Sequence, residues 1–150
     1  MQKYINQKLQ LVSVEVKCKK SNYNSFGKYS YWNIEDICEA IKPLQEKHNV
    51  VFTLDDEIVN IGDRFYVKAT ASVTCTESGE SISVVGYARE PESIKQMNPM
   101  QIVGACSSYA RKRAMSGLLM LDDTKDADSF NKHEDEPSNI NNENGDDDLL

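Results

Sequence analysis

The chain lacks the short motifs on which many nucleotide-driven and hydrolytic enzymes depend. Its 150 residues contain no GxxxxGK[ST] phosphate-binding loop, which argues against an ATP-driven P-loop recombinase. Neither HExxH nor GxSxG occurs, so zinc peptidase and serine hydrolase sites have no support in the sequence. We therefore expect a binding protein rather than an enzyme, with no catalytic residue, no metal and no cofactor.

Long apolar runs and paired cysteines are also missing. No stretch is apolar enough to span a bilayer, and the N-terminal MQKYINQKLQ lacks the apolar core of a signal peptide. The four cysteines, at positions 18, 38, 75 and 106, show no CxxC spacing, and three of them occupy apolar periodic positions. We expect a cytoplasmic protein that does not associate with membranes and that carries buried free thiols.

Acidic residues are few in the body of the chain and concentrated at its end. The net charge is −7, but residues 122–150 hold 11 acidic and two basic residues, which leaves 15 basic and 13 acidic residues in residues 1–121. A nearly neutral body can still bind a polyanion if its basic residues gather on one surface. We predict a DNA-binding domain over residues 1–128 and a disordered acidic tail over residues 129–150, which has too few apolar residues to fold.

Residues 100–128 carry the most informative pattern of the chain, a periodic helix with a basic cluster. Apolar and small residues recur three or four positions apart, which predicts an amphipathic helix that packs closely on a neighbour. Arg111, Lys112 and Arg113 follow one another, so at about 100° per residue they cannot all face a core. With Ser108 one turn before Lys112, they form a candidate phosphate-binding patch; an ordinary solvated helix face is the alternative. The small-residue stripe comprises Val103, Cys106, Ala110, Ala114, Gly117 and Leu121.

Residues 17–32, KCKKSNYNSFGKYSYW, interleave lysines with aromatic residues. Ammonium groups neutralise phosphates and flat rings stack on unpaired bases, so the composition favours single-stranded nucleic acid. We expect a loop or short hairpin in which Trp32 and one tyrosine are buried and the other rings are partly exposed. The candidate contacts here are Lys19, Lys20, Lys28, Tyr29 and Tyr31.

The remaining periodicities predict an α+β fold with an antiparallel sheet of three or four strands and helices on one face. Residues 2–17 fit a helix better than a strand, and Asn33 caps a helix over 34–48 that Pro43 should bend or end. Strands are expected over 50–54, 58–61, 65–75 and 82–89. If Cys75 pairs with Glu80, Lys68 lies beside Tyr87, and Arg89 shares their sheet face. That face is a second candidate DNA surface, or else an ordinary wet sheet face.

Several segments resemble the ERF (Essential Recombination Function) family of phage single-strand annealing proteins. They are Tyr23 to Tyr29, Ile34 to Leu44 with Lys42-Pro43, Gly104-Ala105, Ser108 to Lys112, Ala114-Met115 and the acidic run Asp122 to Asp126. The resemblance implies a β-β-β-α core, rings or filaments of the protein, and ATP-independent annealing of complementary strands in phage recombination. The family usually has an aromatic residue at the position of Arg113.

Two other functions remain open. One is single-strand protection without annealing; the other is a metal-dependent nuclease that uses Asp122, Asp123, Asp126 and Asp128. The tail ends in Asp146-Asp147-Asp148-Leu149-Leu150, which resembles the tip of bacterial single-strand-binding proteins. Solubilisation, mimicry of DNA and docking are its alternative roles. The expected partners are single-stranded DNA, further copies of the chain, and a host or phage single-strand-binding protein or nuclease.

Overall fold

The computed structural model of the chain describes residues 4–121. The predicted acidic tail and the carboxylates from Asp122 onward lie outside the described residues. The elements in chain order are α1 (Ile5–Glu15), β1 (Asn22–Asn24), β2 (Tyr29–Tyr31), α2 (Ile34–His48), β3 (Val50–Ile61), β4 (Arg64–Cys75), β5 (Ser81–Arg89) and α3 (Pro99–Leu119).

The main sheet is antiparallel, with strand order β3-β4-β5. The predicted register between β4 and β5 is confirmed, because Ala69 lies opposite Gly86 and Lys68 opposite Tyr87. The prediction of two short strands before residue 62 was wrong, since β3 is continuous and pairs with β4 over its whole length. The polar run Asp55 to Glu57 stays in the ladder because the long β4 offers a partner to every residue.

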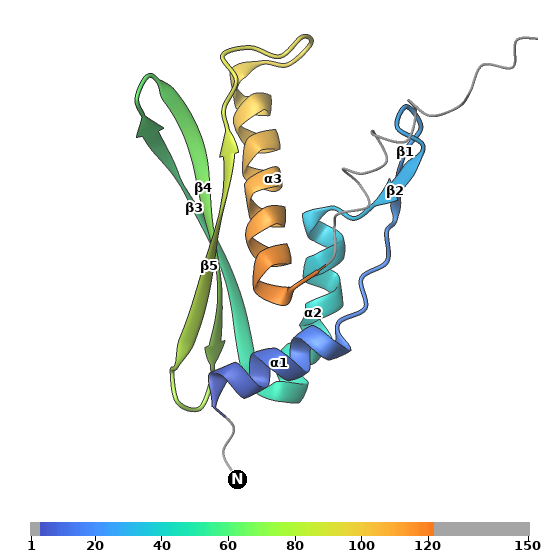
Figure 1. Cartoon of the computed structure of the whole chain (residues 1–150), viewed down its shortest axis with the longest axis vertical. Helices are drawn as coiled ribbons and strands as arrows, with labels where there is room; N and C mark the ends of the chain where they lie inside the picture. The colour runs from blue at the N-terminus through green and yellow to red at the C-terminus, as the bar shows by residue number, and fades with distance from the viewer. Residues whose placement is uncertain (1–3, 122–150) are drawn as a thin grey trace, which may run out of the picture.

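The three helices lie on one face of this sheet, so the predicted α+β class and β-β-β-α core are confirmed (Figure 1). α3 runs along the inner face, against β4 and β5. It approaches β5 most closely at Gly86, where an added Cβ would lie 2.5 Å from the Ala114 nitrogen and 2.6 Å from the Ala110 oxygen. Ile102 rather than Val103 is buried at the start of the stripe, and Val103 is 39% exposed.

α2 begins as the sequence predicts. The Asn33 side chain accepts a hydrogen bond from the Asp36 N–H (2.9 Å), and the Asp36 carboxylate accepts one from the Asn33 N–H (3.0 Å). Pro43 does not end the helix, which continues to His48 and is closed by Asn49 in the left-handed conformation, with φ of 51°. The buried apolar face of α2 holds this turn in place although the proline donates no hydrogen bond.

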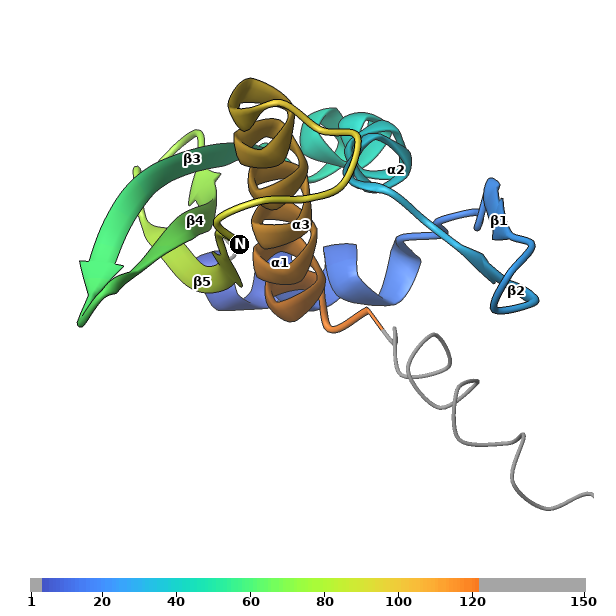
Figure 2. The same cartoon turned by 90° about the horizontal axis from the view of Figure 1, so that it is seen from above.

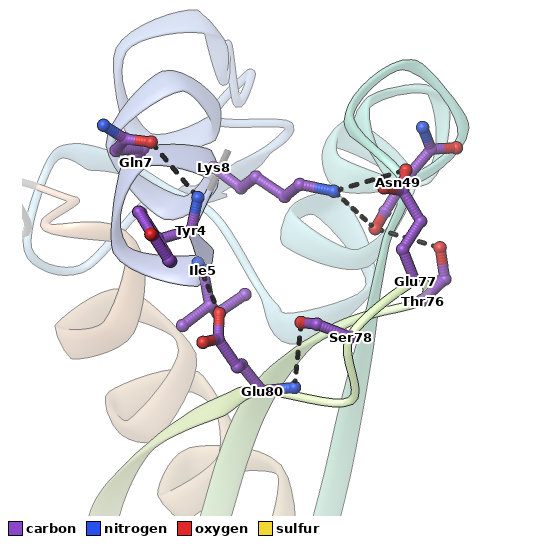
Figure 3. Close-up of polar contacts among 9 residues, drawn as sticks. All are labelled: Tyr4, Ile5, Gln7, Lys8, Asn49, Thr76, Glu77, Ser78 and Glu80. Atoms are coloured by element: carbon purple, nitrogen blue, oxygen red, sulfur yellow. Dashed lines mark hydrogen bonds and ion pairs between the residues drawn. The ribbon is translucent and has the colours of Figure 1, made fainter. Parts of the chain in front are cut away.

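α1 crosses the end of the sheet and is fastened there by polar contacts (Figure 3). The buried Lys8 ammonium lies 3.4 Å from the Asn49 carbonyl oxygen and 3.7 Å from the Glu77 carboxylate. The Glu80 carboxylate accepts a hydrogen bond from the Ile5 N–H (3.3 Å). These contacts join the start of the chain to the β4–β5 turn and to the end of α2, which fixes the layers relative to one another.

β1 and β2 form a separate two-stranded hairpin. Figure 2 shows the hairpin and the main sheet on opposite sides of α3. Trp32, which follows the hairpin, is buried as predicted. The expectation of one buried tyrosine was wrong: Tyr29 and Tyr31 are half-buried and Tyr23 is exposed, because the hairpin stands away from the core.

Candidate nucleic-acid interface

The three consecutive basic residues of α3 point in three directions, as their spacing of about 100° requires. The Arg111 guanidinium lies 3.1 Å from the Asp56 carboxylate of β3. The Lys112 ammonium lies 5.6 Å from the ring centre of Tyr31 on the hairpin side. Arg113 is exposed, and its guanidinium lies 5.8 Å from the ring centre of Tyr109 on the same helix. The three charges therefore do not line one groove.

Arg111 is engaged inside the fold. Asp56 lies on the inner face of the sheet, where it accepts hydrogen bonds from both Arg111 and Ser107. These two donors, the Arg111 side chain first, hold the pKa of the Asp56 carboxyl below its ordinary value. The Asp56 carboxylate compensates the positive charge of the Arg111 guanidinium. The main role of Arg111 is therefore to link α3 to β3 rather than to contact phosphate.

A basic and aromatic surface forms where α3 faces the hairpin. The Lys20 ammonium lies 4.6 Å from the ring centre of Trp32, and the ring centres of Tyr29 and Tyr31 are 6.0 Å apart. Residues 16–34 contain four lysines and no acidic residue. We call this the helix–hairpin surface; it comprises Lys19, Lys20, Lys28, Tyr29, Tyr31, Ser108 and Lys112.

Two acidic residues follow this region in the first turn of α2: the exposed Glu35, and Asp36 at the base of the hairpin. The Asp36 carboxylate accepts hydrogen bonds from the Ser21 hydroxyl (2.6 Å) and the Asn22 amide (3.3 Å). These donors, Ser21 first, lower the pKa of the Asp36 carboxyl. These hydrogen bonds anchor the hairpin to the first turn of α2, and they favour the charged form of Asp36.

The second predicted surface lies on the outer face of the sheet. Lys68 and Tyr87 are cross-strand partners, and Arg89 pairs with Tyr66 on the same face, as predicted. The Lys68 ammonium lies 3.4 Å from the Glu57 carboxylate of β3, which reduces its attraction for phosphate. We call Lys68, Tyr87 and Arg89 the sheet surface. The whole thickness of sheet and α3 separates it from the helix–hairpin surface (Figure 2).

The structure gives three residues at these sites roles that the sequence did not predict. Asp56 accepts hydrogen bonds from Ser107 and Arg111 of α3, and no local pattern indicates contacts between residues 51 and 55 positions apart. Phe26 is 93% exposed at the hairpin turn. A signal for Phe26 existed, because Asn24, Ser25 and Gly27 are turn-forming residues that place their neighbour on a loop tip.

The search against family models gives a match over residues 5–148, to the model described as the ERF superfamily. The chain belongs to the ERF superfamily. It is similar to the essential recombination function protein of Salmonella phage P22, with 46% identity over 129 residues. The match covers 86% of this chain and 61% of the phage P22 protein. No solved structure matches.

The ERF resemblance inferred from the sequence is therefore confirmed. Arg113, where the resemblance implied an aromatic residue, has its planar guanidinium over the ring of Tyr109. All four cysteines are free thiols, two of them buried and two half-buried. Within residues 4–121, no helix is sufficiently long and apolar to cross a membrane, and no His, Cys, Asp or Glu cluster could hold a metal ion.

Proposed function

We propose that this ERF-superfamily protein binds single-stranded DNA and anneals complementary strands without ATP, in phage homologous recombination. The observation that carries the proposal is the helix–hairpin surface. There Lys112 of α3 lies over Tyr31, next to a segment with four lysines and no acidic residue. The similarity to a phage recombination protein supports the same role.

Cations and flat rings serve different parts of the ligand. Lys19, Lys20, Lys28 and Lys112 contact phosphates, while the exposed parts of Tyr29 and Tyr31 stack on bases. Phosphate contacts carry no base information, so binding tolerates any sequence. Affinity falls with salt, with a logarithmic slope of about −0.7 for each phosphate that the protein neutralises.

The sheet surface is the second candidate contact. Lys68, Tyr87 and Arg89 are neighbours in the sheet, and Arg89 has no ion-pair partner among residues 4–121. Glu57 makes this surface the weaker of the two for a polyanion. A second strand bound there, or on an adjacent subunit, provides the encounter that annealing requires.

We further propose that the protein acts in the host cytoplasm as a ring or filament, without catalytic residues of its own. β3 and β5 are the edges of the main sheet, and each has a row of backbone groups available to another copy of the chain. Edge-to-edge assembly repeats the helix–hairpin surface along the oligomer. A single-strand-binding protein or a nuclease of host or phage is the expected working partner.

The test is the rate at which two complementary oligonucleotides anneal in the presence of the full chain, without nucleotide or metal. The two strands carry a donor and an acceptor fluorophore, so pairing is followed by energy transfer. We expect strong acceleration over the spontaneous rate, and less acceleration at higher salt. A matched reaction with non-complementary strands controls for simple aggregation of DNA.

Other outcomes support the alternative functions. Strands that are bound but held apart would indicate single-strand protection and overturn the annealing step. Degradation of the strands on addition of Mg²⁺ would indicate a nuclease instead. Failure to bind single-stranded DNA at all would overturn the whole proposal.

A further inference from the structure

The hairpin turn presents an aromatic ring to solvent on both faces. Phe26 is 93% exposed, the highest value among the large apolar side chains of residues 4–121. It follows β1 and precedes β2, at the end of the hairpin farthest from α2 (Figures 1 and 2). A single exposed apolar residue is ordinary on a protein surface, so the surroundings of Phe26 must decide what the ring does.

The turn that carries Phe26 is held in one conformation. The Asn24 side-chain oxygen accepts hydrogen bonds from the N–H groups of Phe26 and Gly27, each at 3.0 Å. The Asn24 amide also donates to the Tyr29 hydroxyl (3.2 Å), and Lys28 adopts the left-handed conformation with φ of 54°. An ordered turn loses little further entropy when the ring is bound, which favours a binding role over a frayed tip.

The charge around the ring identifies the kind of partner. Four lysines and no acidic residue occupy residues 16–34; the acidic residues that follow are the exposed Glu35, and Asp36, which accepts hydrogen bonds from Ser21 and Asn22. A partner must therefore offer negative charge together with flat apolar surfaces. Unpaired bases on a phosphate backbone have both properties.

The other rings of the hairpin region are less able to accept bases on two sides. The ring centres of Tyr29 and Tyr31 are 6.0 Å apart and the ring planes are tilted by 57°, so the two rings are not parallel and do not form a slot for a base between them. Lysines lie over Tyr31 and Trp32. Tyr23 in β1 is also exposed, at 63%, but Phe26 at 93% is the most exposed ring of the hairpin.

We propose that Phe26 inserts between two adjacent bases of single-stranded DNA held on the helix–hairpin surface. This inference rests on the proposed function and names the residue that distinguishes single strands from duplex. Insertion into duplex DNA must break a stacked pair of base pairs, whereas a flexible single strand opens at small cost. The wedge also spaces the bases apart and leaves their pairing edges accessible to a second strand.

The test compares three substitutions at Phe26 in the full chain. The probe is a single-stranded oligonucleotide with 2-aminopurine at its centre, whose fluorescence reports unstacking. Phe26→Ala should weaken binding about 5- to 150-fold, the fold-change that corresponds to a stacking contribution of about 1–3 kcal/mol, and abolish the fluorescence change. Phe26→Leu should lose nearly as much because it is apolar but not flat, while Phe26→Trp should retain both signals.

The salt slope and a matched variant make the test specific. Phe26 contacts no phosphate, so the slope of affinity against salt should be the same in Phe26→Ala and in the unsubstituted chain. Phe65→Ala removes another exposed phenylalanine, at the start of β4 and away from the hairpin, and should leave binding unchanged.

Three results would overturn the inference. Equal affinity and equal fluorescence in Phe26→Ala would remove Phe26 from the DNA site while the proposed function stands. Loss of binding together with a smaller assembly, measured by light scattering, would show that Phe26 holds a neighbouring copy of the chain instead. If the unsubstituted chain does not bind the probe, the proposed function itself fails.

Discussion

Gly86 is the residue on which the contact between the sheet and α3 depends. It lies in β5, where any side chain would point at the backbone of Ala110 and Ala114. Its own φ is not in the left-handed region, so the requirement for glycine is one of space alone. The close approach that Gly86 permits brings α3 down onto the sheet and thereby sets the position of Lys112.

Gly86→Ala should destabilise the fold by about 1–3 kcal/mol. The new methyl group would lie 2.5 Å from a backbone nitrogen, so α3 must shift away from β5 and the packing of small residues is lost. Urea unfolding followed by circular dichroism measures the change as a lower midpoint with an unchanged slope.

Gly104→Ala, on α3, is the control for a methyl group added away from the contact between α3 and β5. A Cβ at Gly104 meets no atom within 4 Å, and alanine favours helix over glycine by about 1 kcal/mol. This variant should be as stable as the original chain or more so. If Gly86→Ala unfolds at the same urea concentration as Gly104→Ala, the close contact is not what positions α3.

At the scale of elements, α3 joins three others through neighbouring side chains. Arg111 reaches β3, Lys112 reaches the hairpin, and Ala110 and Ala114 pack against β5. One helical turn therefore serves stability on one side and binding on another. Replacing Arg111 and Lys112 together would mix the effect on stability with the effect on binding. Single replacements separate the two effects.

Arg111→Ala should lower stability by about 1–3 kcal/mol, because it leaves the half-buried Asp56 carboxylate without its main donor. The lowered pKa of Asp56 stabilises the folded state at pH values above the ordinary carboxyl pKa of about 3.9, and this contribution is lost as the pH falls below it. Urea unfolding at pH 7 and pH 3 should therefore show a smaller pH dependence for Arg111→Ala than for the original chain.

Lys112→Ala is the companion variant. It should leave stability within about 0.5 kcal/mol, lower the affinity for single-stranded DNA and reduce the salt slope by about 0.7. Titration of a labelled oligonucleotide at several salt concentrations measures both quantities. The assignment of roles is wrong if Arg111→Ala flattens the salt slope and Lys112→Ala does not.

The sequence predicted elements better than the contacts between them. The β4–β5 register followed from alternation on two faces and a four-residue turn, and the Asn33 cap followed from local spacing. The sequence predicted two strands in place of β3 because Asp55, Asp56 and Glu57 are typical of a loop. The partner of the Asp56 side chain is Arg111 on α3, which the local sequence does not reveal. The direction of a side chain such as Arg111 depends on a partner far away in the sequence, so a local pattern cannot predict it.

At the scale of the whole molecule, the described chain has two basic surfaces and two unpaired sheet edges. The helix–hairpin surface and the sheet surface lie on opposite sides of α3, and both edges of the main sheet are open within residues 4–121. Against this stands the charge of residues 129–150, which hold seven acidic residues and one lysine. We predict that this polyanionic segment, tethered to the same chain at high local concentration, competes with DNA for the basic surface.

Deletion of residues 129–150 should therefore tighten binding to single-stranded DNA. The gain should be largest at low salt and shrink as salt rises, because both the tail and the DNA are attracted through screened charges. A variant of unchanged length, with the seven acidic residues of the tail replaced by their amides, should show the same gain. A variant with the tail sequence scrambled should bind like the original chain, because composition rather than order decides a charge effect. Equal affinity in the original, deleted, amide and scrambled proteins would exclude competition by the tail. A change in affinity in only the deleted and scrambled proteins would instead indicate a docking role that depends on the order of the tail residues.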